Sequence, residues 1–198
     1  MSFSGDGGPS LLVPLVGKTA TFLVEGRHAN VKFARTLVSA IAETGHPCII
    51  FDIDALYSSN ADLIFADLPD AASFTVRVPH PGSDIEPEFS SLFASQQKVI
   101  VIDSLNSLYH LVSLEDGSSR GRKLMFALAS LSHFARENGG AVVLSMYKRE
   151  GFAKSGRGRS ISNLSDVTAS VDARGEEIEI RTEKGSAWPA GVFSTRIP

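Results

Sequence analysis

The sequence has one cysteine, no long uninterrupted apolar run and no excess of positive charge, and each absence excludes a class of protein. A single cysteine, Cys48, cannot form an internal disulfide and argues against a thiolate metal site. Its position in the apolar run 48–51 predicts a buried thiol, and the lack of disulfides fits a reducing compartment. The apolar run Leu11 to Val16 is too short for a membrane span, and no basic segment precedes it. A net charge of −3 gives no general attraction to polyanions. We therefore expect a cytoplasmic protein, or a nuclear one if the source is eukaryotic, in which any nucleic-acid site is local.

One folded domain is what length and composition predict. The 198 residues are 43% apolar and 21% charged, which suffices for one well-packed core and is short for two. Residues 1–10 are rich in glycine and serine and are expected to be flexible. No internal repeat or linker divides the rest, so we predict a single domain over residues 1–198.

Apolar segments with strand character alternate with segments of helical spacing. Residues 99–102 are four consecutive β-branched residues ending at Asp103, which is typical of a strand buried inside a parallel sheet. Helices are expected over Ala29 to Thr44, near Ala61 to Phe65 and over Gly121 to Asn138. Strands are expected over Thr19 to Glu25, Cys48 to Asp52, Phe74 to Val78, Lys98 to Asp103, Ala141 to Met146, Val167 to Asp172, Glu176 to Thr182 and Val192 to Arg196. This order predicts an α/β fold: a mostly parallel twisted sheet, helices on both faces, and antiparallel C-terminal strands.

Gly26 stands between the first expected strand and the first expected helix, a position where α/β proteins often bind phosphate. Free backbone N–H groups and the helix dipole both favour an anion there. A working ATP loop has the pattern G-x-x-x-x-G-K-[S/T], in which the glycines let the backbone wrap the phosphates, the lysine bridges them and the hydroxyl ligates magnesium. In residues 26–33, Gly26 and Lys32 keep the required spacing, but Val31 replaces the second glycine and Phe33 replaces the hydroxyl. The motif has lost two of its four essential residues.

The remaining features of residues 26–33 suit a bare phosphate or a partner's carboxylate better than magnesium-ATP. Val31 adds a branched side chain where the backbone must approach an anion closely, and Phe33 cannot ligate magnesium, which holds its waters tightly. We expect no ATP or magnesium cofactor, no bound metal and no catalytic activity. The candidate phosphate-binding residues are Gly26, Arg27, Asn30 and Lys32.

In this order the segments resemble the RecA-like P-loop core shared by archaeal and eukaryotic recombinases, their shorter paralogues, KaiC-like proteins and the Elongator accessory subunits. The resemblance covers about Gly17 to Ile197 and places residues 26–33 at the Walker A position and Val99 to Asp103 at the Walker B position. It implies that Asp103 corresponds to the magnesium-orienting acid and that Asp54 corresponds to the residue that activates water. Both are vestigial catalytic candidates here, because the loop opposite them is degraded.

The strongest local positive charge follows the expected strand Ala141 to Met146. Residues 148–159 contain five cationic side chains against one glutamate, and glycines and serines separate them, so we predict a mobile loop. Phosphate contacts, a flexible backbone and one aromatic ring for base stacking are the features of a single-strand binder. The nucleic-acid-binding candidates are Lys148, Arg149, Phe152, Lys154, Arg157 and Arg159.

Three functions follow from these features and from the resemblance. The first is a non-catalytic RecA-like protein that binds single-stranded DNA or assists a recombination or repair complex. The second is a subunit of the Elongator-accessory type, in which a RecA-like ring binds tRNA or partner subunits. The third is a weak ATPase whose site a neighbouring subunit completes through Arg149, Arg157 or Arg159. The expected partners are nucleic acid and other RecA-like subunits, in a homo- or hetero-oligomer, with no membrane.

Overall fold

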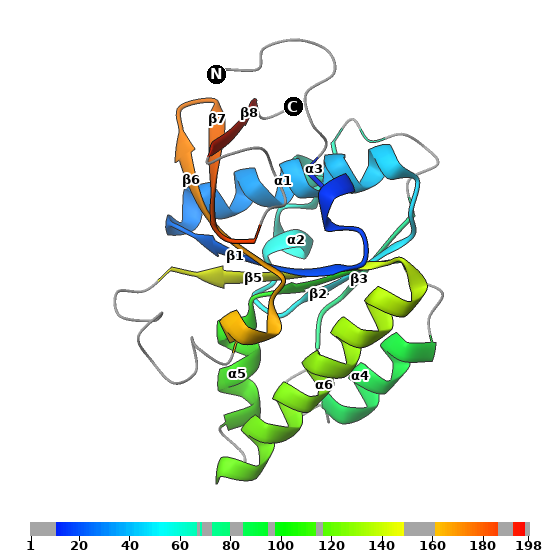
Figure 1. The fold of residues 1–198 in the computed structure, drawn as a ribbon. Helices are drawn as coiled ribbons and strands as arrows, with labels where there is room; N and C mark the ends of the chain where they lie inside the picture. Colours follow the sequence, from blue (N-terminus) through cyan, green and yellow to red (C-terminus); the bar gives the residue numbers. More distant parts are fainter. Residues whose placement is uncertain are drawn as a thin grey trace.

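The computed structural model confirms the α/β architecture, and it describes residues 11–66, 68, 73–79, 85–94, 98–113, 117–148, 161–185 and 192–196. One eight-stranded sheet runs through the molecule in the order β3-β2-β4-β5-β1-β6-β7-β8 (Figure 1). Helix α1 lies on one face of the sheet, and α4, α5 and α6 lie on the other (Figure 1). The expected flexible segment 1–10 lies outside the described residues.

Most elements coincide with the sequence prediction to within a few residues. After a short 3-10 turn, η1 (Val13–Leu15), the strands are β1 (Lys18–Val24), β2 (Cys48–Asp52), β3 (Phe74–Arg77), β4 (Val99–Asp103), β5 (Ala141–Tyr147), β6 (Val167–Arg174), β7 (Glu177–Lys184) and β8 (Val192–Arg196). The helices are α1 (Gly26–Thr44), α2 (Leu56–Ser59), α3 (Ala61–Ile64), α4 (Ile85–Ala94), α5 (Leu105–Ser113) and α6 (Gly117–Asn138). None of these helices is long and apolar enough to cross a lipid bilayer.

The sheet is parallel from β3 to β6 and antiparallel at its C-terminal end, as predicted. The parallel pairs are β3 with β2, β2 with β4, β4 with β5, β5 with β1, and β1 with β6. The antiparallel pairs are β6 with β7 and β7 with β8. Every residue of β2 and β4 is buried, because helices cover both faces of the sheet there. This double burial explains the continuous apolar runs in the sequence.

Two hydrophobic cores lie on opposite faces of the sheet. One core joins the inner face of α1 to β1 and β6, and it contains Phe22, Phe33 and Leu37. The other joins α5 and α6 to β4 and β5, and it contains Leu108 and Leu128. The lone thiol, Cys48, is buried in the first core, and burial raises its pKa above the ordinary range.

The sequence prediction missed α2, α4 and α5. Helix α4 carries Pro87 in its first turn, where proline is tolerated although it usually signals a break. Helix α5 begins directly after the strand-ending pair Asp103-Ser104, and only two full turns separate its start from its last residue. Short helices of this kind give too few periodic positions for recognition from one sequence.

We predict that Phe33→Ala lowers the free energy of unfolding by about 3–5 kcal/mol, because a fully buried aromatic ring would leave a cavity. The Phe33 ring is 1% exposed and its centroid lies 4.7 Å from that of Phe22. Urea unfolding followed by circular dichroism measures the change. Phe126→Ala is the matched control, because Phe126 is 76% exposed and its loss should change stability by less than about 0.5 kcal/mol. Equal effects of the two changes would contradict the packing described for Phe33.

Candidate functional site

Residues 26–33, interpreted from the sequence as a phosphate loop, form the first two turns of α1. The helix was expected to begin at Ala29, but it begins at Gly26 and follows β1 after the single residue Glu25. Gly26 has φ +83°, a left-handed conformation that glycine adopts without strain and that turns the chain directly from strand to helix. Residues 26–33 are therefore helical and not a loop, because only Glu25 remains between the strand and the helix.

The side chains at the start of α1 are engaged with the protein itself. Phe33 packs in the core against Phe22, and Val31 packs beside it at the edge of the same core. Asn30 is 2% exposed and donates a hydrogen bond of 3.1 Å to the Tyr147 hydroxyl at the end of β5. The Asn30–Tyr147 hydrogen bond thus joins the start of α1 to the end of β5, and Phe33 joins α1 to β1.

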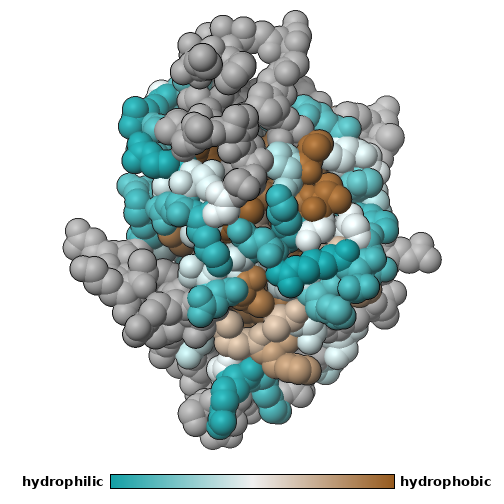
Figure 2. Space-filling view, viewed as in Figure 1, coloured by the Kyte–Doolittle hydropathy of each residue, from teal (hydrophilic) through white to brown (hydrophobic). Residues whose placement is uncertain are grey.

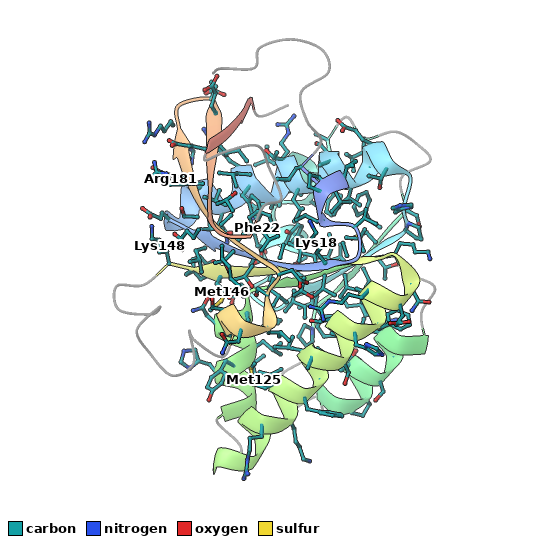
Figure 3. All side chains as sticks on the ribbon, in the orientation of Figure 1. Lys18, Phe22, Met125, Met146, Lys148 and Arg181 are labelled. Carbon is teal, nitrogen blue, oxygen red and sulfur yellow. The ribbon has the colours of Figure 1, made fainter. Side chains whose placement is uncertain are left out.

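Lys32 and Lys148 both make contacts within the chain. The Lys32 ammonium donates to the backbone carbonyl of Gly175, in the turn between β6 and β7. The Lys148 ammonium forms an ion pair with Glu25, and the hydrogen bond to that carboxylate raises the pKa of Lys148. Lys148 therefore lies next to the start of α1, at the end of β5 (Figure 3).

Asp54 and Asp103 lie close together at the carboxyl ends of β2 and β4, as expected for residues that follow neighbouring parallel strands. Asp54 is exposed and accepts a hydrogen bond of 2.5 Å from the Ser104 hydroxyl. Asp103 is 1% exposed, and its Oδ1 has no hydrogen-bond partner among the described residues. The structure thus pairs an exposed carboxylate with a buried one.

The buried carboxyl of Asp103 has a strongly perturbed pKa. Burial is the largest cause of its rise to about 7, and the charges of Asp54 and Asp52 raise it further, while a hydrogen bond from Ser145 lowers it. A carboxyl with this pKa is largely protonated below neutral pH. In this environment the protonated form of Asp103 is favoured over a wider pH range than for an exposed carboxyl.

Sequence reasoning did not identify the residues around this pair of acids. Asp52 is fully buried and accepts backbone N–H bonds from Tyr57 and Ser58, which fixes the turn after β2. Tyr57 is buried, and burial followed by the charge of Asp103 raises the pKa of its hydroxyl. The only sequence signal for this cluster was the acidic pattern of residues 52–54.

The described residues do not provide the donor set of a magnesium-ATP site. Position 33 offers a buried phenyl ring where a hydroxyl is needed, and the ammonium of Lys32 bonds to Gly175. Within the described ranges, no three His, Cys, Asp or Glu side chains are grouped so that they could hold a metal ion. Among the described residues, position 33 thus supplies no hydroxyl for magnesium and the Lys32 ammonium is engaged within the chain.

Two groups of predicted residues are only partly described. The side chain of Arg27, a phosphate candidate, lies outside the described part of α1. Of the nucleic-acid candidates, Lys148 alone is described. The rest, Arg149, Phe152, Lys154, Arg157 and Arg159, lie outside the described residues.

No protein-family model matches this sequence, and neither does any curated protein. Among solved structures, the chain is similar to a crystal structure of the RadB recombinase, with a TM-score of 0.69 and 18% sequence identity, over 97% of this chain and 94% of that one. In all, 570 solved chains match, so the fold is widely shared and does not by itself select a function. The likeness confirms the RecA-like core predicted from the sequence as the fold of this chain.

The buried carboxyl of Asp103 predicts a pH dependence of stability. The pKa of this group is about 7 in the folded protein against an ordinary value of 3.8, so between these values the folded chain holds a proton that the unfolded chain releases. The free energy of unfolding therefore falls as pH rises through this window, by at most about 4 kcal/mol from this group. Asp103→Asn should reduce that fall, measured by urea unfolding at pH 5 and pH 8.

The control for this measurement is Asp62→Asn, which removes an exposed carboxylate on α3. It should follow the natural chain at both pH values. If the free energy of unfolding of Asp103→Asn fell between pH 5 and pH 8 as much as that of the natural chain, Asp103 would not be the cause of the pH dependence.

Proposed function

We propose that this RecA-like chain is a non-hydrolysing protein that binds single-stranded nucleic acid and assists a recombination or repair complex. The observation that carries the proposal is the position of the basic segment. Residues 148–159 hold five cations in a chain of net charge −3, and they follow the end of β5 directly beside the start of α1. The segment thus begins at the carboxyl end of β5, where Lys148 lies.

Both flanks of this segment are fixed to the core. On one side, the Lys148 backbone N–H donates to the Val24 carbonyl at 3.0 Å. On the other, Ile161 is 6% exposed and packs in the core beneath the sheet. The described residues on either side of 149–160, Lys148 and Ile161, are thus both held by the core.

The start of α1 supports the non-hydrolysing part of the proposal. The helix leaves no loop for phosphates, and its side chains contact Phe22, Tyr147 and Gly175. Magnesium-ATP bound there would have to displace the Lys32 contact with Gly175, and it would find no hydroxyl at position 33 to ligate magnesium.

Binding to single-stranded DNA should depend steeply on salt. Five phosphate contacts predict a slope of log affinity against log salt concentration of about −3.5 for a single strand. Fluorescence anisotropy with a labelled single strand, a duplex and a folded tRNA, at several salt concentrations, measures it. We expect the single strand to bind most tightly and without any need for ATP.

Replacing cations tests whether the basic segment is responsible. Arg157→Gln with Arg159→Gln should weaken binding at least tenfold and reduce the slope by about 1.4. The matched control changes the same charge elsewhere, with Lys98→Gln and Arg122→Gln, both exposed in the described structure. Salt-insensitive or absent binding to all three ligands would remove the nucleic-acid proposal, whereas a preference for tRNA together with a hexameric mass would favour the ring-forming alternative.

ATP hydrolysis is expected to stay at background. Purified protein with magnesium-ATP should release no more phosphate than buffer, with or without single-stranded DNA, and Lys32→Ala should change nothing. The exposed Lys32 contact with Gly175 contributes little to stability, so the variant should remain folded by circular dichroism. Turnover that disappears in Lys32→Ala would establish a working site and overturn the non-hydrolysing assignment.

A further inference from the structure

We infer that Glu25 is an intramolecular competitor of nucleic-acid phosphate: its carboxylate holds the Lys148 ammonium in the free protein, and a bound phosphate must displace it. Lys148 is the first cation of the basic segment, so this inference rests on the proposed function. It adds to that function a residue that lowers the affinity of the chain for its own ligand. Glu25 therefore regulates binding without contacting the nucleic acid.

The sheet fixes the backbones of both residues. The Lys148 N–H donates to the Val24 carbonyl and the Glu25 N–H donates to the Val171 carbonyl, each at 3.0 Å. These bonds continue the parallel pairing of β1 with β5 and β6 beyond the last residues of β1 and β5. Glu25 and Lys148 are therefore neighbours across the sheet, and their side chains meet in an ion pair.

The Glu25 side chain does not cap α1. Glu25 occupies the N-cap position, but its carboxylate makes no capping hydrogen bond to the helix. Serine, threonine, aspartate and asparagine commonly cap a helix, because their short side chains reach its free N–H groups. The Glu25 carboxylate binds the Lys148 ammonium instead, so it can be changed without removing a cap from the helix.

The ion pair is open to a polyanion. The side chain of Lys148 is 41% exposed and that of Glu25 is 46% exposed. A pair this exposed is held weakly, because water and salt screen both charges. A nucleic acid that offers several phosphates to the basic segment can therefore take the ammonium from the Glu25 carboxylate.

A second carboxylate neutralises cations on the neighbouring β6–β7 hairpin. Glu179 on β7 forms ion pairs with Arg174 and Arg181, at 2.7 and 3.0 Å. Figure 2 shows hydrophilic residues, in teal, along the side of the molecule where Figure 1 places β6 and β7, and Figure 3 shows Arg181 and Lys148 on that side. These cations are thus compensated by acids of the chain, and removal of Glu25 leaves one uncompensated cation beside the basic segment.

An NMR titration of the Lys148 ammonium tests the ion pair without nucleic acid. The hydrogen bond to Glu25 raises the pKa of Lys148, while the weaker effects of Glu183 and Arg181 oppose each other. Glu25→Gln should therefore lower the pKa of Lys148. An unchanged pKa would show that the pair does not form in solution and would overturn the inference.

The binding assay compares the natural chain with Glu25→Gln. The variant should bind a labelled single strand about three- to fivefold more tightly at low salt, because the Lys148 ammonium is then free for phosphate. Fluorescence anisotropy measures the affinity, and circular dichroism checks that the variant is folded. The gain should shrink as the salt concentration rises, because salt screens exposed charges.

The matched control is Glu43→Gln, which removes an exposed carboxylate from the other end of α1. Glu43 lies roughly 27 Å from Glu25 along the helix, well beyond the Debye length of about 10 Å in 0.1 M salt. Its removal should change the affinity by less than about 1.5-fold. In a Lys148→Gln background, Glu25→Gln should likewise give no more than this small gain. A full gain without Lys148 would come from net charge alone and would contradict the inference.

The outcomes separate the inference from the proposed function. If the natural chain binds the single strand and Glu25→Gln binds it no more tightly than Glu43→Gln does, the inference alone fails. If neither the natural chain nor Glu25→Gln binds, both fail. Binding seen only in Glu25→Gln would support the inference while removing the proposed function from the natural chain.

Discussion

The direct junction of β1 and α1 is the constraint on which the strand-end region depends. One residue, Glu25, separates the strand from the helix, and the left-handed Gly26 makes the turn possible. Packing of Phe33 on Phe22 then fixes the rotation of α1 about its axis. That rotation places Asn30 at the Tyr147 hydroxyl and Lys32 at the carbonyl of Gly175. Helix α1 thereby connects the parallel core with the antiparallel hairpin.

The strand segments and the mostly parallel sheet with antiparallel C-terminal strands could be predicted from the sequence, because burial leaves recognisable apolar patterns in it. Strands covered by helices on both faces have continuous apolar runs, as in residues 99–103, and the alternating pattern of β7 marks its half-exposed position. The start of α1 could not be placed in this way. Comparison with the phosphate-loop motif treats residues 26–33 as a loop. That they are helical, with Phe33 directed into the core, depends on the packing of α1 on the sheet.

Tertiary packing also determines which of the acidic residues is buried and which is exposed. The sequence placed Asp54 and Asp103 after two predicted strands, and the structure shows that these strands are neighbours and brings the two acids together. Which carboxylate is buried could not be predicted, because burial depends on the turn that Asp52 fixes and on the position of Ser104. The same limit applies to α6: its apolar periodicity was evident, but the exposure of Phe126 depends on which neighbours cover the helix.

Because Phe33 points into the core, a substitution at this position that favoured magnesium binding would lower the stability of the fold. The side chain that a nucleotide site needs at this position is a small hydroxyl, and a threonine there would leave a void beside Phe22 and bury an oxygen without a partner. A single substitution toward that chemistry would therefore lower the stability of the fold. A hydroxyl at position 33 would therefore need compensating changes in β1, in α1 and in the turn between β6 and β7.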